Sequence, residues 1–247
     1  MGRLGEDGMR AARVVTLVLT AHGSADPRSA DTTLAIAECV RRLRPSLDVR
    51  VAFCEQNFPN LRDVLPTVPR HAVVVPLLLA DAYHARVDIP AVVAESGADV
   101  RLADVLGEDD RLIHVLRQRL EHAGVSRLDA SVGVVVTAVG STRRDANART
   151  EAVARELTLT TRWTATTAFA TGPQPGVIEA ADLLRRRGAS RLVIAPWFLA
   201  HGRIIDRIAD LARSEAIPMS SPLGAHRLVA ETVLDRFDAA IEQRTAA

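Results

Sequence analysis

Two similar segments constrain the fold of this chain more than any other feature. Residues 17–24 read Leu-Val-Leu-Thr-Ala-His-Gly-Ser, and residues 134–141 read Val-Val-Val-Thr-Ala-Val-Gly-Ser, so that His22 aligns with Val139 at an offset of 117 positions (139−22). Farther along, Pro76 aligns with Pro196 at an offset of 120 (196−76). A single long internal period indicates two similar lobes rather than a solenoid. We expect the chemistry to lie where the two copies differ.

Composition narrows the function classes. The 247 residues are 48% hydrophobic, which is enough for two domains of roughly 120 residues each. A net charge of +1 gives no long-range field for nucleic acid or an anionic membrane, so we predict neither partner. The chain has two cysteines, no apolar stretch long enough to span a bilayer and no signal-peptide pattern, which predicts a cytoplasmic protein.

The predicted domain organisation follows the duplication. We predict a disordered leader over residues 1–10, an N-terminal α/β lobe over 11–124 that carries a metal site, and a C-terminal α/β lobe over 130–247 that completes a cleft, with a linker at 124–129. All 31 basic residues are arginine, which excludes mechanisms that need a lysine, such as a Schiff base or a phosphate-loop lysine.

Short valine-rich runs alternate with stretches of helical periodicity, and this alternation predicts two doubly wound α/β lobes with parallel sheets. The expected strands cover residues 14–21, 49–55, 72–79 and 99–103, then 131–138, 163–169, 190–199 and 217–221. The expected helices cover residues 28–44, 59–66, 85–95 and 109–122, then 143–157, 174–187, 203–215 and 225–242.

Three side chains with ligand chemistry follow strands of the first lobe. His22 follows the first strand, Glu55 ends the second, and His84 lies just beyond the third. Ligands bind outside the carboxyl ends of strands in open parallel sheets, so these residues are expected to converge there. Two imidazoles and a carboxylate are suited to a divalent first-row transition metal.

Each of these residues also has a purely structural interpretation. His22 fits a turn before the helix-capping Ser24, Glu55 fits a solvated strand end, and His84 fits a helix start. Their common location favours a site over three separate coincidences. His201 follows a strand of the second lobe; whether it lines the cleft stays open from the sequence, and a direct ligand role is the less favoured interpretation. The remaining histidines are assigned to surface or packing roles: His71, His114, His122 and His226.

Several motifs in fixed order resemble those of the sirohydrochlorin chelatases, the cobalt- or iron-inserting relatives of ferrochelatase. The motifs lie at residues 22–27 (His-Gly-Ser-Ala-Asp-Pro), 51–56 (Val-Ala-Phe-Cys-Glu-Gln), 59–61 (Pro-Asn-Leu), 76–84 (Pro-Leu-Leu-Leu-Ala-Asp-Ala-Tyr-His) and 88–90 (Asp-Ile-Pro). Long members of that family have two similar α/β lobes around a central cleft. The resemblance implies that His22 and His84 are the metal-binding histidines and that Glu55 is the acidic site residue.

The resemblance also implies an activity. It implies a metal chelatase, a lyase that inserts Fe²⁺ or Co²⁺ into sirohydrochlorin with release of two protons, in sirohaem or cobalamin biosynthesis. No cofactor is expected beyond the divalent metal substrate. The chain lacks a Cys-x-x-Cys pair and a histidine-rich tail, features of some cobalt-pathway members, and an iron–sulfur cluster is therefore not expected. The 81–84 segment also lacks the glycine often found before the second histidine, which affects the expected loop geometry.

The implied substrate carries eight carboxylates, so a basic cleft rim is expected. The predicted substrate-binding residues are Ser24, Arg28, Arg86, Arg143 and Arg144, with Arg203 and Arg207 near the same junctions. A solvated helix surface is the competing interpretation for each arginine. Two alternative functions remain open, namely a non-catalytic tetrapyrrole or metal carrier and a plain two-lobed small-molecule binding protein. Because the duplication supplies both cleft walls, a monomer is the simplest expectation.

Overall fold

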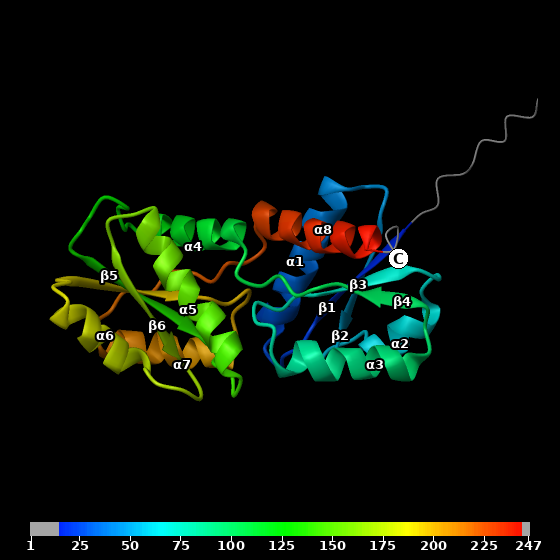
Figure 1. Ribbon diagram of the computed structural model, residues 1–247, viewed down its shortest axis with the longest axis horizontal. Helices are drawn as coiled ribbons and strands as arrows, with labels where there is room; N and C mark the ends of the chain where they lie inside the picture. Colours follow the sequence, from blue (N-terminus) through cyan, green and yellow to red (C-terminus); the bar gives the residue numbers. More distant parts are fainter. Residues whose placement is uncertain (1–14, 244–247) are drawn as a thin grey trace, which may run out of the picture.

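The computed structural model describes residues 15–243, so the predicted leader over 1–10 lies outside the described residues. Figure 1 shows two α/β lobes side by side, each built on a parallel sheet with helices on both faces. This confirms the predicted fold class of two doubly wound lobes. None of the helices within residues 15–243 is long and apolar enough to cross a membrane.

The first lobe is built on a four-stranded parallel sheet in the order β2-β1-β3-β4. Its strands are β1 (Thr16–Ala21), β2 (Asp48–Phe53), β3 (Ala72–Pro76) and β4 (Val100–Leu102). Successive side chains of a strand point to opposite faces. Leu17 and Leu19 of β1 therefore pack in one apolar cluster and Val18 in another, which explains the uninterrupted apolar runs.

Helices connect the parallel strands of the first lobe as βαβ units. They are α1 (Pro27–Leu43), α2 (Leu61–Val64) with the 3₁₀ turn η1 (Leu65–Thr67), and the π-helical turn η2 (His84–Asp88) that leads into α3 (Ile89–Ser96). Asp26 caps α1 by accepting a hydrogen bond from the Arg28 backbone N–H, and Pro27 takes the first helical position. The capping fixes where the chain turns after β1.

The second lobe repeats this pattern with a three-stranded sheet in the order β6-β5-β7. Its strands are β5 (Val132–Ala138), β6 (Thr164–Phe169) and β7 (Arg191–Pro196), and its helices are α5 (Arg144–Leu159), α6 (Val177–Arg186) and α7 (Arg203–Ser214). The order matches β2-β1-β3 of the first lobe. The duplication read from the sequence is therefore a duplication of structure.

The strand predicted at 217–221 is wrong. The structure has only an isolated bridge between Met219 and Ile194 there. The two prolines around Met219, Pro218 and Pro222, have no backbone N–H to donate to a ladder, which leaves a single pairing position between them. The sheet of the second lobe accordingly has one strand fewer than that of the first lobe.

The two lobes exchange their last helices. Helix α4 (Asp110–His122) follows the first sheet in the chain but packs against β7 and α5, whereas α8 (Arg227–Glu242) packs against α1 and β3 (Figure 1). The Arg101 guanidinium donates to the Ala240 carbonyl, and Arg119 donates to the Leu223 carbonyl. One apolar cluster runs through both lobes, and its packing fixes the position of one lobe relative to the other.

Candidate active site

The backbone brings His22 and Glu55 together at the carboxyl end of the first sheet. The pairing of β1 with β2 continues beyond the strands, because the Glu55 N–H donates to the His22 carbonyl at 3.0 Å. Gly23 has φ +100°, and a Cβ atom there would lie 1.8 Å from the Glu55 carbonyl oxygen. Only glycine fits such a close approach of two loops. The side chains then meet, with His22 Nε2 3.0 Å from Glu55 Oε1.

His84 joins this pair from the loop after β3. Because β1 lies between β2 and β3 in the sheet, the three loops are neighbours at one edge. The His22 and His84 rings have centroids 4.1 Å apart and planes inclined by 37°. The side chains of His22, Glu55 and His84 are 37%, 52% and 48% exposed, so all three are open to a ligand. The structure therefore places all three predicted site residues in contact.

The protonation state of His22 suits metal binding. Burial, and then the charge of neighbouring His84, lower the pKa of His22 below its usual value of 6.5, against the opposing effect of Glu55. His22 is thus a neutral imidazole at pH 7, the form that ligates metals. Its Nδ1 atom is buried without a hydrogen-bond partner within residues 15–243.

The candidate ligand side chains contact one another or a neighbouring carboxylate. Within the described part of the chain, no three His, Cys, Asp or Glu side chains are already disposed to hold a metal ion together. His22 Nε2 is in contact with Glu55, and His84 Nδ1 with Asp88. An incoming cation would need the contact between His22 and Glu55 to open, which is a side-chain rotation at a half-exposed position.

The second lobe keeps the backbone of this site without its donor side chains. Val139 stands at the position of His22 and Thr171 at that of Glu55, with the Thr171 N–H donating to the Val139 carbonyl at 2.8 Å. Gly140 has φ +92°, and a Cβ there would lie 2.1 Å from the Thr171 carbonyl oxygen, as at Gly23. The three candidate ligand side chains therefore lie in the first lobe alone, with no counterparts at Val139 and Thr171.

Two cavities between the lobes meet at this site. The first cavity has a volume of about 270 Å³ and is lined by the chain after β3, including His84, and by the loops after β5 and β7. The second cavity, about 310 Å³, is lined by Gly23 and Ser24 from the first lobe and by His201 from the second. Val139 and Phe198 line both cavities, and the Val139 side chain is 41% exposed. His84 thus shares a cavity with an apolar wall of the second lobe, and His22 directly precedes Gly23 of the other cavity.

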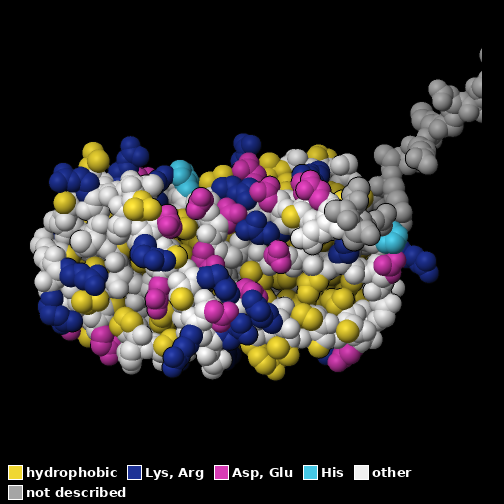
Figure 2. All heavy atoms as spheres, viewed as in Figure 1, with side chains coloured by type: hydrophobic (Ala, Val, Ile, Leu, Met, Phe, Trp, Pro, Cys, Tyr) yellow, Lys and Arg dark blue, Asp and Glu magenta, His cyan; other side chains and the backbone are white. Residues whose placement is uncertain are grey.

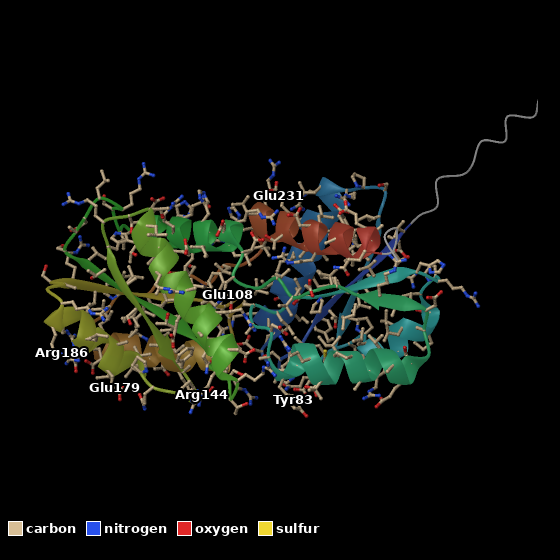
Figure 3. All side chains as sticks on the ribbon, in the orientation of Figure 1. Tyr83, Glu108, Arg144, Glu179, Arg186 and Glu231 are labelled. Carbon is tan, nitrogen blue, oxygen red and sulfur yellow. The ribbon has the colours of Figure 1, made fainter. Side chains whose placement is uncertain are left out.

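The predicted substrate-binding residues lie near these cavities and differ in their contacts and exposure. Ser24 lines the second cavity, where its Oγ accepts from the Asp26 N–H at 3.1 Å. The guanidinium groups of three arginines are held by neighbouring carboxylates: Arg28 by Asp26 and Asp206, Arg86 by Asp81, and Arg143 by Asp145. Arg144 begins α5 and is exposed, and it lies at the same edge of the molecule as Tyr83 of the other lobe (Figure 3).

The ion pairs and hydrogen bonds that join the lobes do not follow from any local sequence pattern. The Arg28 guanidinium reaches Asp206 at 2.5 Å, and Arg149 Nη2 donates to the Asp81 carbonyl at 3.3 Å. Figure 2 shows charged side chains of both signs over the junction between the lobes. Such half-exposed pairs contribute about 0–1 kcal/mol each to stability. Their partners are 178 and 68 residues apart, beyond any local sequence pattern.

A protein-family comparison places the chain. The model of the family named CbiX matches residues 16–123 and, a second time, residues 133–240. Together the two matches cover more than half of the sequence. The chain belongs to the CbiX family. The two CbiX matches coincide with the two copies of the duplication.

Two relatives from Priestia megaterium are similar over most of this CbiX chain. One is a sirohydrochlorin cobaltochelatase, 25% identical over 210 residues, which are 80% of this chain and 68% of the relative. The other is a sirohydrochlorin ferrochelatase, 24% identical over 205 residues, which are 76% of this chain and 74% of the relative.

Among solved structures, SirB from Bacillus subtilis with Fe³⁺ has the same fold as this CbiX chain. It superposes with a TM-score of 0.78 at 21% identity and covers 92% of this chain and 95% of that chain. Both lobes therefore share their arrangement with SirB.

Proposed function

We propose that this chain is a sirohydrochlorin chelatase, which inserts Fe²⁺ or Co²⁺ into sirohydrochlorin with release of two protons. The observation that carries the proposal is the meeting of His22, Glu55 and His84 at the edge of the first lobe, opposite the apolar wall of the second. The relatives named above are metal chelatases for this tetrapyrrole. The alternative of a non-catalytic carrier has no observation in its favour.

His22 and His84 hold the metal substrate in the proposed reaction. Imidazole nitrogen accepts iron and cobalt alike, and neutral His22 offers a lone pair without first losing a proton. The two adjacent rings, tilted by 37°, come from neighbouring loops of one sheet, which brings their nitrogens to the same edge of the lobe. The metal is thereby presented from the first lobe toward the cleft.

Glu55 is the proposed proton acceptor. Metal insertion requires two inner pyrrole nitrogens to lose their protons, and a carboxylate beside the metal takes up such a proton. Glu55 contacts His22 in the absence of metal, and a cation bound by His22 releases the carboxylate for this role. Its 52% exposed side chain connects the site to solvent, where the proton leaves.

The second lobe supports the ring. The apolar side chains of Val139 and Phe198 line both cavities and offer a surface for the face of a flat macrocycle. Arginines at the rim bind its carboxylates, because a guanidinium pairs with a carboxylate through two parallel hydrogen bonds. Arg143 and Arg144 have the favoured position, at the start of α5 two residues after Ser141 of the first cavity.

Replacing both arginines tests this assignment. The variant R143A/R144A should raise KM for sirohydrochlorin roughly tenfold or more, the effect of losing one hydrogen bond between charged groups. Its affinity for Co²⁺ should stay at the wild-type value, because neither residue contacts the histidines. The matched control is R185A/R186A at the far end of the second lobe (Figure 3). An unchanged KM in R143A/R144A would remove these arginines from the site.

The choice between iron and cobalt stays open. The two Priestia megaterium relatives are named for different metals, and their identities of 25% and 24% to this chain favour neither. Both ions accept the same ligands, and supply in the cell often decides between them. The chain acts in sirohaem biosynthesis if it uses iron and in cobalamin biosynthesis if it uses cobalt.

The proposed activity is tested by anaerobic insertion. Purified protein, sirohydrochlorin and either Fe²⁺ or Co²⁺ are mixed, and the absorbance change of the macrocycle is followed beside a sample without protein. A chelatase increases the rate over the uncatalysed reaction for at least one metal. Tight binding of the ring with no increase in rate for either metal would instead identify a carrier.

A further inference from the structure

We propose that Asp88 is a positioning residue for His84, holding the imidazole ring so that its Nε2 atom faces the metal. The inference rests on the proposed function of His84 as a metal ligand. The contact that carries it joins His84 Nδ1 to Asp88 Oδ2 at 2.5 Å. An ionised carboxylate only accepts hydrogen bonds, so Nδ1 carries the proton and donates it.

The hydrogen bond fixes which nitrogen of His84 is free. In a neutral imidazole one ring nitrogen carries the proton and the other has the lone pair. A proton held on Nδ1 by Asp88 leaves the lone pair on Nε2. Histidines that bind metals commonly donate their other N–H to a carboxylate, which sets the tautomer and the ring orientation. Asp88 gives His84 this arrangement before any metal arrives.

The local backbone brings the two side chains together. His84 and Asp88 are the first and last residues of the π-helical turn η2, in which the Ile89 N–H bonds to the His84 carbonyl. π-Helical turns are rare in proteins, and those that occur often lie at functional sites. The corresponding helix of the second lobe, α7, is α-helical from its first residue, Arg203, and has no histidine in its first turn. The π turn and the His–Asp pair thus occur in the lobe that carries the metal site.

The Asp88 carboxylate forms no ion pair with an arginine within residues 15–243, although the chain is rich in arginine. Other carboxylates around the cleft contact guanidinium groups: Asp26, Asp81, Asp145 and Asp206. Within residues 15–243, the ion pair in which Asp88 takes part is the one with His84. An arginine there would compete for the carboxylate and place a positive charge beside the incoming cation. The charge of Asp88 is therefore available to His84.

Titration with Co²⁺ alone, followed by its absorption spectrum, tests the inference without the tetrapyrrole. D88A should bind Co²⁺ about 10–100-fold more weakly than the wild type, the usual cost of removing such a partner. D88N should stay within a few-fold of the wild type, because the amide oxygen accepts the same hydrogen bond. The matched control is D99A, which removes the carboxylate beside His71 in another His–Asp pair, 3.2 Å apart. D99A should bind Co²⁺ as the wild type does.

The outcomes separate this inference from the proposed function. If H84A loses affinity for Co²⁺ and D88A does not, Asp88 has no positioning role while the metal site stands. If D88N is as weak as D88A, the hydrogen bond is not the cause and the inference is wrong. If H84A binds as tightly as the wild type, or the wild type binds no Co²⁺, the proposed site and the inference both fail. Unchanged circular dichroism shows that D88A is folded.

Discussion

The variant H22A/H84A should fold like the wild type and insert metal into sirohydrochlorin no faster than the reaction without protein. The two substitutions remove the adjacent imidazole rings, whose centroids lie 4.1 Å apart. We expect kcat/KM to fall by at least ~10²-fold, because losing two metal ligands costs more than the roughly 10–100-fold lost with one partner of a ligand. Anaerobic stopped-flow absorbance of the macrocycle measures this loss.

A second double variant shows whether removing two histidines away from the candidate site affects the activity. H114A/H122A removes two imidazoles from α4, the helix that packs on the second lobe. It should insert metal at the wild-type rate, since neither residue lines the cavities. If H22A/H84A kept most of the wild-type kcat/KM while its circular dichroism was native, the assignment of the metal site would be wrong.

The substitution G23A should be the most damaging single change to the architecture of the site. A residue with a Cβ at φ +100° pays about 1–3 kcal/mol for its backbone conformation alone. The methyl group would in addition lie 1.8 Å from the Glu55 carbonyl oxygen, so the loops carrying His22 and Glu55 must separate. We expect a lower free energy of unfolding in urea and, in the protein that remains folded, a much lower kcat/KM.

Two glycines provide the comparison for G23A. G140A makes the same clash in the second lobe, where a Cβ would lie 2.1 Å from the Thr171 carbonyl oxygen. G97A also has a positive φ, +62°, but nothing within 4 Å of its Cβ, so it should cost only about 1–2 kcal/mol. An unfolding midpoint for G23A equal to that of G97A would show that the close approach has no energetic weight.

The fold could be predicted from the sequence largely because its strands have a clear sequence pattern. Valine-rich runs at fixed offsets gave the duplicated strands, and residues directly after parallel strands converge by topology, which brought His22 and Glu55 together. His84 is farther from its strand, and its place followed from the neighbouring loops. The failed strand at 217–221 shows the limit of this pattern, because Pro218 and Pro222 have no backbone N–H to donate and only an isolated bridge forms between them, at Met219.

Other features depend on long-range packing that a sequence pattern does not encode. The apolar stripes of α4 and α8 indicate that each helix is buried, but not that each packs on the other lobe. Arg28 and Arg86 could be placed at the junctions, yet their carboxylate partners depend on side-chain orientation. Asp88 lies four residues after His84 in a recognisable motif, and only the geometry of η2 shows that their side chains meet.

In the proposed reaction a divalent metal binds to the first lobe at His22 and His84, beside Glu55, and the second lobe binds the ring. Crystals soaked anaerobically in Co²⁺ test it most directly through anomalous diffraction at the cobalt edge. We expect one strong peak within bonding distance of His22 and of His84 Nε2, with the hydrogen bond between His84 and Asp88 kept. A peak at Val139 and Thr171 in the second lobe, or no peak at the first-lobe histidines, would contradict it.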